Sequence, residues 1–227
     1  MNEGLNDNAV EKAIRRVTHI QAEGLIEANQ KFHKDLIAGI SIAQDINGKR
    51  QKKTVQFIDF ENPEKNDFLV ANQFWVKGHS ETDRPDIVIF INGIPLVVIE
   101  CKSPVAKEGG LSKSISQLTR YQKEIPQLFI TNQILIGINL FGAKYGVTGA
   151  ESEQYHEWKD IGNEKLPNMA EHPSVKEMLE LGLIKKQDLS DNPTAQGVLI
   201  AGVLNKKTLL DTIQNFIVFE HERGKII

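Results

Sequence analysis

Apolar positions along the first forty residues recur at helical spacing. Between residues 11 and 40 they fall three or four apart, and Gly24 divides them into two groups, which predicts one or two helices. Residues 48–53 are basic and read as a turn, which is followed by strand character at Val55, Phe57 and Ile58 and again over residues 68–76. Residues 1–50 are therefore a helical lead-in, and residues 78–84 are a polar connection.

Two continuous apolar runs follow, over residues 87–91 and 96–99, and Asn92-Gly93 between them predicts a hairpin. Runs without polar alternation predict strands that are buried on both faces. A helix is expected over residues 112–125, with a serine to cap it and Pro126 to close it, and another buried strand over residues 134–138. This order predicts a mixed α/β fold, in which a crossover helix packs on a mixed sheet.

The chain becomes more polar beyond Gly142, and residues 151–168 are expected to form a surface excursion. Two further helices are predicted over residues 173–181 and 206–220. We interpret residues 1–227 as one domain, with a core at 54–140 and the excursion and C-terminal helices at 141–227. No apolar run is long enough to span a bilayer, and the single cysteine, Cys101, suits a reducing cytoplasm, so a cytoplasmic protein is expected.

Charged residues stand at the ends of the two apolar runs. Glu100 and Lys102 are two apart on one strand, so their side chains leave the same face. Asp86 can join them only if an odd number of residues is added between the paired strands. A regular two-residue turn would place Asp86 and Glu100 on opposite faces of the sheet. We therefore predict an odd-numbered loop, either Asn92 to Ile94 or a bulged loop of Ile91 to Gly93.

Two carboxylates beside an ammonium group suit metal-dependent hydrolysis of a phosphodiester. Asp86 and Glu100 are the expected ligands of Mg²⁺, the Cys101 backbone carbonyl is a further candidate ligand, and Lys102 would orient or activate water. In the following helix, Gln117 and Tyr121 stand four apart and share a face. Arg84 is a candidate phosphate contact, whereas the basic residues at 49, 50, 52 and 53 are more typical of a solvated turn. The net charge of −3 argues against non-specific coating of nucleic acid and does not exclude a DNA enzyme, because other domains or subunits can supply strong DNA binding.

The segment Arg84-Pro85-Asp86, followed after thirteen residues by Glu100-Cys101-Lys102, resembles the PD-(D/E)XK nuclease motif. Gln117 and Tyr121 resemble the Q-x-x-x-Y element of RecB-like nucleases, which approaches the DNA backbone. The run of residues 69–104 is similar to the N-terminal nuclease region of the type I restriction enzyme R subunit, as are residues 57–68 and 215–220. The resemblance implies a restriction-endonuclease-like core with helical N- and C-terminal additions.

The resemblance also implies an activity and a set of partners. The family cleaves unmodified foreign double-stranded DNA with Mg²⁺ after ATP-driven translocation, together with methylation and specificity subunits. The chain contains no G-x-x-x-x-G-K-[ST] motif, so ATP hydrolysis and the motor domains are expected to lie outside it. Two alternatives stay open, namely a catalytically weak scaffold or interaction module with a nuclease fold, and a free-standing RecB-like nuclease.

Overall fold

The fold is built on one mixed five-stranded sheet. The computed structural model describes residues 2–46, 48–102, 110–139, 142–159, 179–182, 195–222 and 225–226. The strand order is β3-β6-β7-β8-β9, and every neighbouring pair is antiparallel except β7 and β8. The strands are β3 (Phe68–Asn72), β6 (Ile87–Ile91), β7 (Ile94–Cys101), β8 (Ile134–Ile138) and β9 (Ala143–Gly146). The predicted mixed α/β architecture is confirmed.

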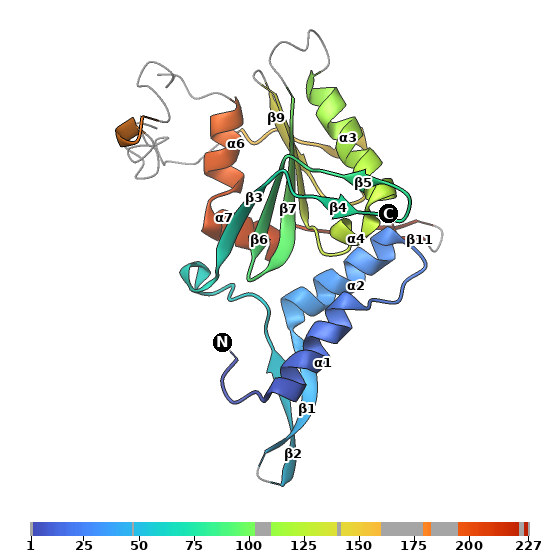
Figure 1. Cartoon of the computed structure of the whole chain (residues 1–227), viewed down its shortest axis with the longest axis vertical. Helices are drawn as coiled ribbons and strands as arrows, with labels where there is room; N and C mark the ends of the chain where they lie inside the picture. Colours follow the sequence, from blue (N-terminus) through green and yellow to red (C-terminus); the bar gives the residue numbers. More distant parts are fainter. Residues whose placement is uncertain are drawn as a thin grey trace.

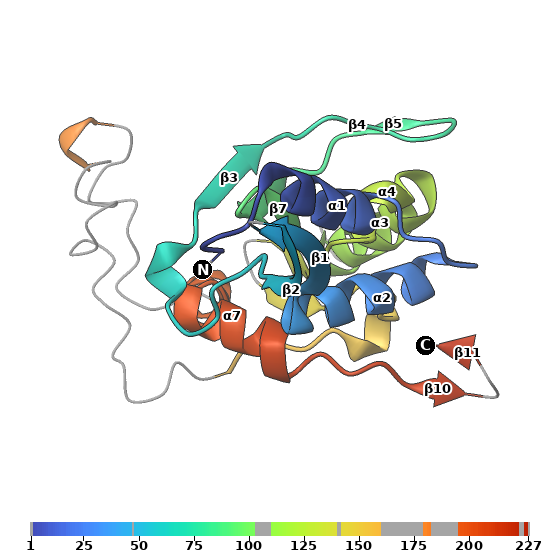
Figure 2. The ribbon, with the colours of Figure 1, turned by 90° about the horizontal axis from the view of Figure 1, so that it is seen from below.

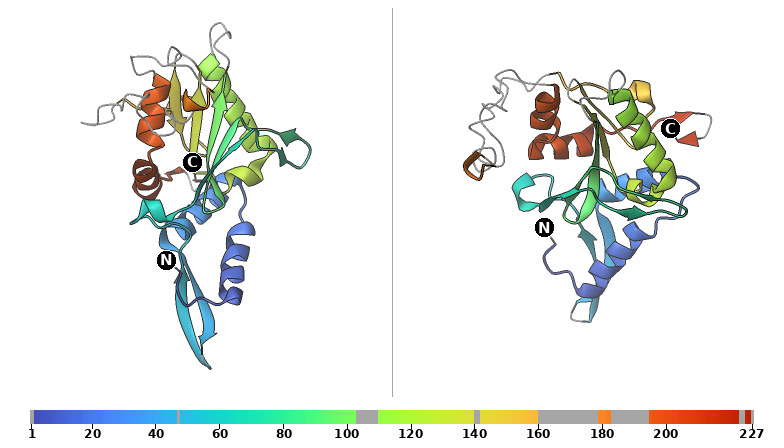
Figure 3. Two further views of the ribbon diagram at one scale, coloured as in Figure 1. Left: turned by 60° about the vertical axis from the view of Figure 1, so that its left-hand side comes forward. Right: turned by 45° about the horizontal axis from the view of Figure 1, so that its top comes forward.

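Helices cover both faces of this sheet (Figure 1). The helix α3 (Gly110–Glu124) and the short α4 (Pro126–Phe129) pack on one face, and α6 (Ala195–Val203) and α7 (Lys206–Asn215) pack on the other. The two further views in Figure 3 show the same three layers. Because apolar side chains from both faces of β7 and β8 enter a core, these strands lack polar alternation until Glu100 is reached.

The lead-in contains two helices and an unexpected hairpin. The helices are α1 (Asp7–Thr18) and α2 (Leu25–Ala38), as the apolar spacing predicted. The predicted basic turn over residues 48–53 is wrong, because most of it belongs to β2 (Lys49–Val55), which pairs with β1 (Ile40–Ile46). α1 packs along this hairpin (Figure 2), and the hairpin projects from the body of the molecule (Figures 1 and 3). Pairing with β1 outweighs the turn-like composition of the basic segment.

Two expectations for residues 68–84 need correction. The strand that starts at Phe68 stops at Asn72, because Gln73 has a positive φ of 49° and redirects the chain. A separate small sheet then forms from β4 (Val76–Lys77) and β5 (Thr82–Asp83), and β5 lies inside the segment 78–84 that was expected to be a polar connection. Short 3₁₀ turns occur at η1 (Pro63–Lys65) and η2 (Ser152–Gln154).

The expectations for the helices also need correction. α3 begins at Gly110, so Ser112 lies inside the helix and does not cap it. α7 ends at Asn215, five residues earlier than predicted, and Phe216 is 70% exposed. α6 was not predicted, because its sequence is apolar all round and carries no amphipathic period.

The polar C-terminal third is only partly described. Tyr155 lies in the expected surface excursion, yet it is buried and packs in the core against α3. A last strand pair is formed by β10 (His221–Glu222) and β11 (Lys225–Ile226), whereas most of the helix predicted over residues 173–181 lies outside the described residues. Within the described ranges, no helix combines the length and the apolar character that crossing a membrane requires.

Candidate active site

The β6–β7 hairpin decides whether Asp86 and Glu100 share a face. Its turn has two residues, since Ile91 pairs with Ile94, so the predicted odd-numbered loop is wrong. The ladder then shifts by one residue between Ile89 and Phe90: Phe90 pairs with Pro95, but Ile89 pairs with Val97. This bulge supplies the extra residue, Leu96, that the loop was expected to supply.

The shifted register puts the two acids opposite one another. Ile87 pairs with Ile99, so the next positions, Asp86 and Glu100, lie across from each other at the end of the ladder. The prediction that the two side chains leave the same face is confirmed. This face is the one covered by α3. Val88 and Val98 lie two positions from Asp86 and Glu100 on the same strands, so they share that face, and both pack in the apolar cluster beneath α3.

Local sequence explains both the turn and the bulge. Asn92 and Gly93 have positive φ values of 52° and 80°, as a type I′ turn requires. Pro95 has no N–H to donate to the ladder, and prolines within sheets are found at edges or bulges. Pro95 is therefore a signal in the sequence for the bulge, which the prediction from parity placed in the loop instead.

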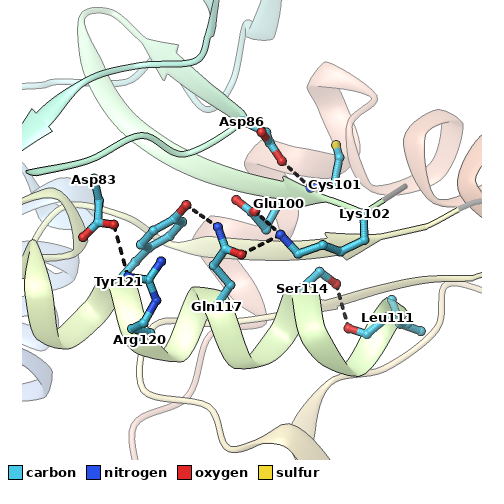
Figure 4. A network of polar contacts seen from close by, with 10 residues as sticks. All are labelled: Asp83, Asp86, Glu100, Cys101, Lys102, Leu111, Ser114, Gln117, Arg120 and Tyr121. Atoms are coloured by element: carbon cyan, nitrogen blue, oxygen red, sulfur yellow. Dashed lines mark hydrogen bonds and ion pairs between the residues drawn. The ribbon is translucent and has the colours of Figure 1, made fainter. Parts of the chain in front are cut away.

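Asp86 is anchored by the backbone of the neighbouring strand. Its Oδ2 atom accepts a hydrogen bond of 2.8 Å from the Cys101 N–H, and its backbone carbonyl accepts one of 2.7 Å from the Gln73 N–H. The carboxylate is thus fixed at the carboxyl end of β7 (Figure 4). Cys101 contributes an N–H donor to the site, a role that the sequence did not suggest, while metal binding by its carbonyl stays a prediction.

Glu100 is a buried carboxylate with one free oxygen. The residue is only 2% exposed, and its Oε1 atom lies 2.6 Å from the Lys102 Nζ atom. Its Oε2 atom is buried and finds no hydrogen-bond partner among the residues that the structure describes. Burial raises the pKa of Glu100, the ammonium of Lys102 opposes that shift, and the charge of Asp86 adds to it. A cation at this point would relieve a buried charge that is only partly compensated.

Lys102 is held between the strand and α3. Its Nζ atom also donates to Gln117 Oε1 at 2.5 Å, and the Gln117 amide in turn donates to the Tyr121 hydroxyl (Figure 4). Burial raises the pKa of Tyr121, so its hydroxyl is neutral at neutral pH. The predicted proximity of Gln117 and Tyr121 is confirmed. Gln117 contacts Lys102 directly, and Tyr121 contacts it through Gln117.

A glycine lets α3 come close to the site. Gly137 of β8 pairs with Glu100, and a Cβ atom at that position would lie 2.6 Å from Ser114 Oγ on α3. The absence of a side chain there brings the helix against the sheet at the level of Glu100. This close approach puts Gln117, one turn along the helix from Ser114, within reach of Lys102.

Arg84 flanks this cluster, whereas the basic residues of β2 lie far from it. The Arg84 guanidinium lies over the ring of Trp75, at 5.0 Å, two residues before Asp86. The basic residues of β2 lie in the projecting hairpin, at the far end of the molecule from the carboxyl end of β7 (Figure 1). The hairpin is therefore not part of the site.

The donor set suits a hard divalent cation. In the described ranges, no three side chains of His, Cys, Asp or Glu come together in a metal-binding group. Asp86 and Glu100 therefore offer two carboxylates, and the remaining ligands have to be main-chain, water or phosphate oxygens. Mg²⁺ is commonly bound in this way, through one or two carboxylates with water and substrate phosphate. The residues present fit Mg²⁺.

The sequence of the chain is similar to those of known restriction enzymes. The family model for the type I restriction enzyme R protein N terminus matches residues 2–154. The type I restriction enzyme HindI endonuclease subunit of Haemophilus influenzae is 32% identical over 162 residues, which are 71% of this chain and 15% of the relative. The MjaIXP endonuclease subunit of Methanocaldococcus jannaschii is 34% identical over 164 residues, 71% of this chain and 16% of the relative. The chain thus spans about one sixth of these relatives.

Proposed function

The chain belongs to the family of type I restriction enzyme R protein N-terminal regions, and on this basis we propose that it is the Mg²⁺-dependent DNA-cleaving domain of such an enzyme. The observation that carries the proposal is the shifted register, which puts the Asp86 and Glu100 carboxylates opposite one another beside Lys102. A buried acid with a free oxygen, a second fixed acid and an ammonium group are together what phosphodiester hydrolysis needs. The core is accordingly proposed to be of the PD-(D/E)XK type.

Asp86 and Glu100 would hold Mg²⁺, with the Cys101 carbonyl as a further oxygen donor. When bound, Mg²⁺ supplies Lewis-acid polarisation of the phosphate and lowers the pKa of a coordinated water. The Cys101 N–H keeps the Asp86 carboxylate in place, and the Lys102 ammonium compensates the Glu100 charge and orients the attacking water. Water forms a bond to phosphorus as one ester P–O bond breaks, which leaves a phosphate monoester and a hydroxyl group.

Gln117 and Tyr121 are proposed to position Lys102 and to approach the DNA backbone. Gln117 fixes the direction of the Lys102 side chain, because its Oε1 atom accepts from the ammonium while its amide is held by Tyr121. The Tyr121 ring is buried in the core beneath α3, so this support is rigid. Arg84 is proposed to contact the DNA strand next to Asp86.

The relatives are endonuclease subunits of much greater length, which suggests the wider enzyme. We propose that the chain acts with ATP-driven motor domains of the same polypeptide and with methylation and specificity subunits. Double-stranded DNA that lacks the protective modification would be its substrate, cut after translocation. ATP would be consumed outside the residues of this chain.

Substitution of Asp86 in the assembled enzyme tests the proposal. Asp86→Asn keeps the shape of the side chain but removes the charge that would hold Mg²⁺, so DNA cleavage should fall by at least about 100-fold. Asp67→Asn is the matched control, since Asp67 is exposed just before β3, beside the turn at the other end of the β6–β7 ladder, and the variant should cut normally. Undiminished cutting by Asp86→Asn would favour a scaffold role for this domain.

A further inference from the structure

An exposed tryptophan stands next to the candidate site. Trp75 is 65% exposed, although an indole ring carries a large apolar area that folding normally buries. Its neighbour Phe74 packs edge-to-face against Phe90 of β6, with ring centroids 5.3 Å apart. The backbone at Trp75 is therefore anchored to the sheet while the indole itself is left in solvent.

Backbone hydrogen bonds place this tryptophan beside the catalytic segment. The Gln73 N–H donates to the Asp86 carbonyl at 2.7 Å, and the Phe74 N–H donates to the Pro85 carbonyl at 3.2 Å. Trp75 continues this pairing and meets Arg84, whose guanidinium carbon lies 5.0 Å from the ring centroid. The positive φ of Gln73 turns the chain out of β3 at this point, which is a strained conformation for a residue other than glycine.

We propose that Trp75 and Arg84 form a stacking platform for an unstacked nucleobase of the DNA strand that enters the site. An exposed aromatic ring with a planar cation beside it is how proteins bind the bases of single strands, because each base has a π-face and each nucleotide a phosphate. Only Pro85 separates Arg84 from Asp86, so a strand whose phosphate lies at Asp86 carries its neighbouring bases past the indole.

The platform implies a preference in substrate structure. In an intact duplex both faces of each base are covered by stacking, so an indole can take a base only from single-stranded or locally opened DNA. This proposal rests on the proposed function, because DNA is inferred as the ligand from the position of the platform beside the proposed cleavage residues. It adds that DNA is opened next to the cut phosphodiester.

Binding of labelled oligodeoxynucleotides to the chain in EDTA tests the platform without cleavage. Wild type should bind a single strand more tightly than a strand of the same length made abasic at its centre. Trp75→Ala should weaken binding of the normal strand by about tenfold or more, and should make the normal and abasic strands equal. Trp75→Phe should restore most of the affinity, because it restores an aromatic face.

Leu69→Ala is the matched control, since Leu69 is a large exposed apolar residue on the adjacent β3 strand. It should leave the affinity for both strands within about twofold, which is the spread expected for surface substitutions. Equal binding of normal and abasic strands by wild type would overturn the platform, as would a Trp75→Ala variant with unchanged affinity. Weaker assembly of the enzyme with unchanged DNA binding would also overturn it, in favour of a protein partner.

The two proposals fail separately. The Asp86→Asn assay reports on cleavage, whereas the abasic comparison reports on base stacking and needs no metal. A Trp75→Ala effect in a protein whose Asp86→Asn variant still cuts would sustain the platform and reject the nuclease site. Loss of cutting in Asp86→Asn together with equal binding of the two strands would do the opposite.

Discussion

The Asp86 carboxylate accepts a hydrogen bond of 2.8 Å from the Cys101 N–H, across the open end of the β6–β7 ladder. This contact exists only because one extra residue, Leu96, is accommodated in β7. Without that bulge, Asp86 would lie opposite Ile99 and would point to the other face of the sheet. The chemistry of the site therefore depends on an irregularity five residues away along the strand.

The turn that starts this register should be sensitive to Asn92→Ala. The Asn92 side chain accepts from the Asp67 N–H and donates to the Phe57 carbonyl and to Asn66 Oδ1, and its backbone has a positive φ. Loss of three hydrogen bonds and added backbone strain should lower the free energy of unfolding by about 3 kcal/mol. Urea denaturation measures this, and exposed Gln51→Ala in the β1–β2 hairpin should change the value by less than about 0.5 kcal/mol.

Stability should depend on pH through Glu100. Burial raises its pKa above the unfolded value, so between those two pKa values the native state holds more protons than the unfolded state. The free energy of unfolding should therefore fall as pH rises through this range, even though Lys102 opposes the shift. Glu100→Gln should remove that fall, and Glu11→Gln on exposed α1 should retain it. Parallel pH profiles for Glu100→Gln and wild type would show that Glu100 is not the group responsible.

Mg²⁺ should stabilise the isolated chain, because a ligand that binds the folded form alone shifts the unfolding equilibrium. At about 100 times its dissociation constant the gain is about 2.7 kcal/mol. Thermal unfolding with and without MgCl₂ should show the increase in wild type and lose most of it in Asp86→Asn and Glu100→Gln. An equal increase in all three proteins would mean that the ion binds elsewhere.

Tyr121→Phe should affect cleavage more than folding. The substitution keeps the buried ring but removes the hydroxyl that accepts a hydrogen bond from the Gln117 amide. Gln117, which contacts Lys102, is then held less firmly. Removal of one hydrogen bond corresponds to a fall in the cleavage rate of about 2- to 10-fold. Gln117→Ala, which removes the direct contact, should be at least as severe. A Tyr121→Phe enzyme with lower stability and an unchanged rate would assign the pair to packing alone.

Much of the core could be predicted from residue patterns, but the site could be predicted only in part. The apolar runs of β6, β7 and β8 and the spacing of Gln117 and Tyr121 each report on a local period, so they identified the sheet and one face of α3. The extra residue was predicted in the loop and lies in β7, at Leu96. The requirement that Asp86 and Glu100 share a face shows that one residue is extra, but it does not show at which position. The position of Trp75 beside the site could not be predicted, since the exposure of a side chain depends on the tertiary structure.

The N-terminal hairpin shows another limit of sequence patterns. The basic residues of β2 carry the composition of a solvated turn, and their strand conformation comes from pairing with β1. α6 escaped prediction for a related reason, since a helix that is apolar all round has no amphipathic period to detect. In both cases the conformation depends on the segment that packs or pairs with the element, and the element's own pattern does not carry that information.

Lys102, held 2.6 Å from Glu100, is proposed to take part in the cleavage chemistry. The most direct measurement is DNA cleavage and ATP turnover, side by side, in the assembled enzyme carrying Lys102→Ala, with exposed Lys113→Ala on α3 as the matched control. Lys102→Ala should lose DNA cleavage by at least about 100-fold while ATP turnover continues, and Lys113→Ala should retain both activities. Undiminished DNA cleavage by Lys102→Ala would exclude Lys102 from the chemistry and place the active site elsewhere.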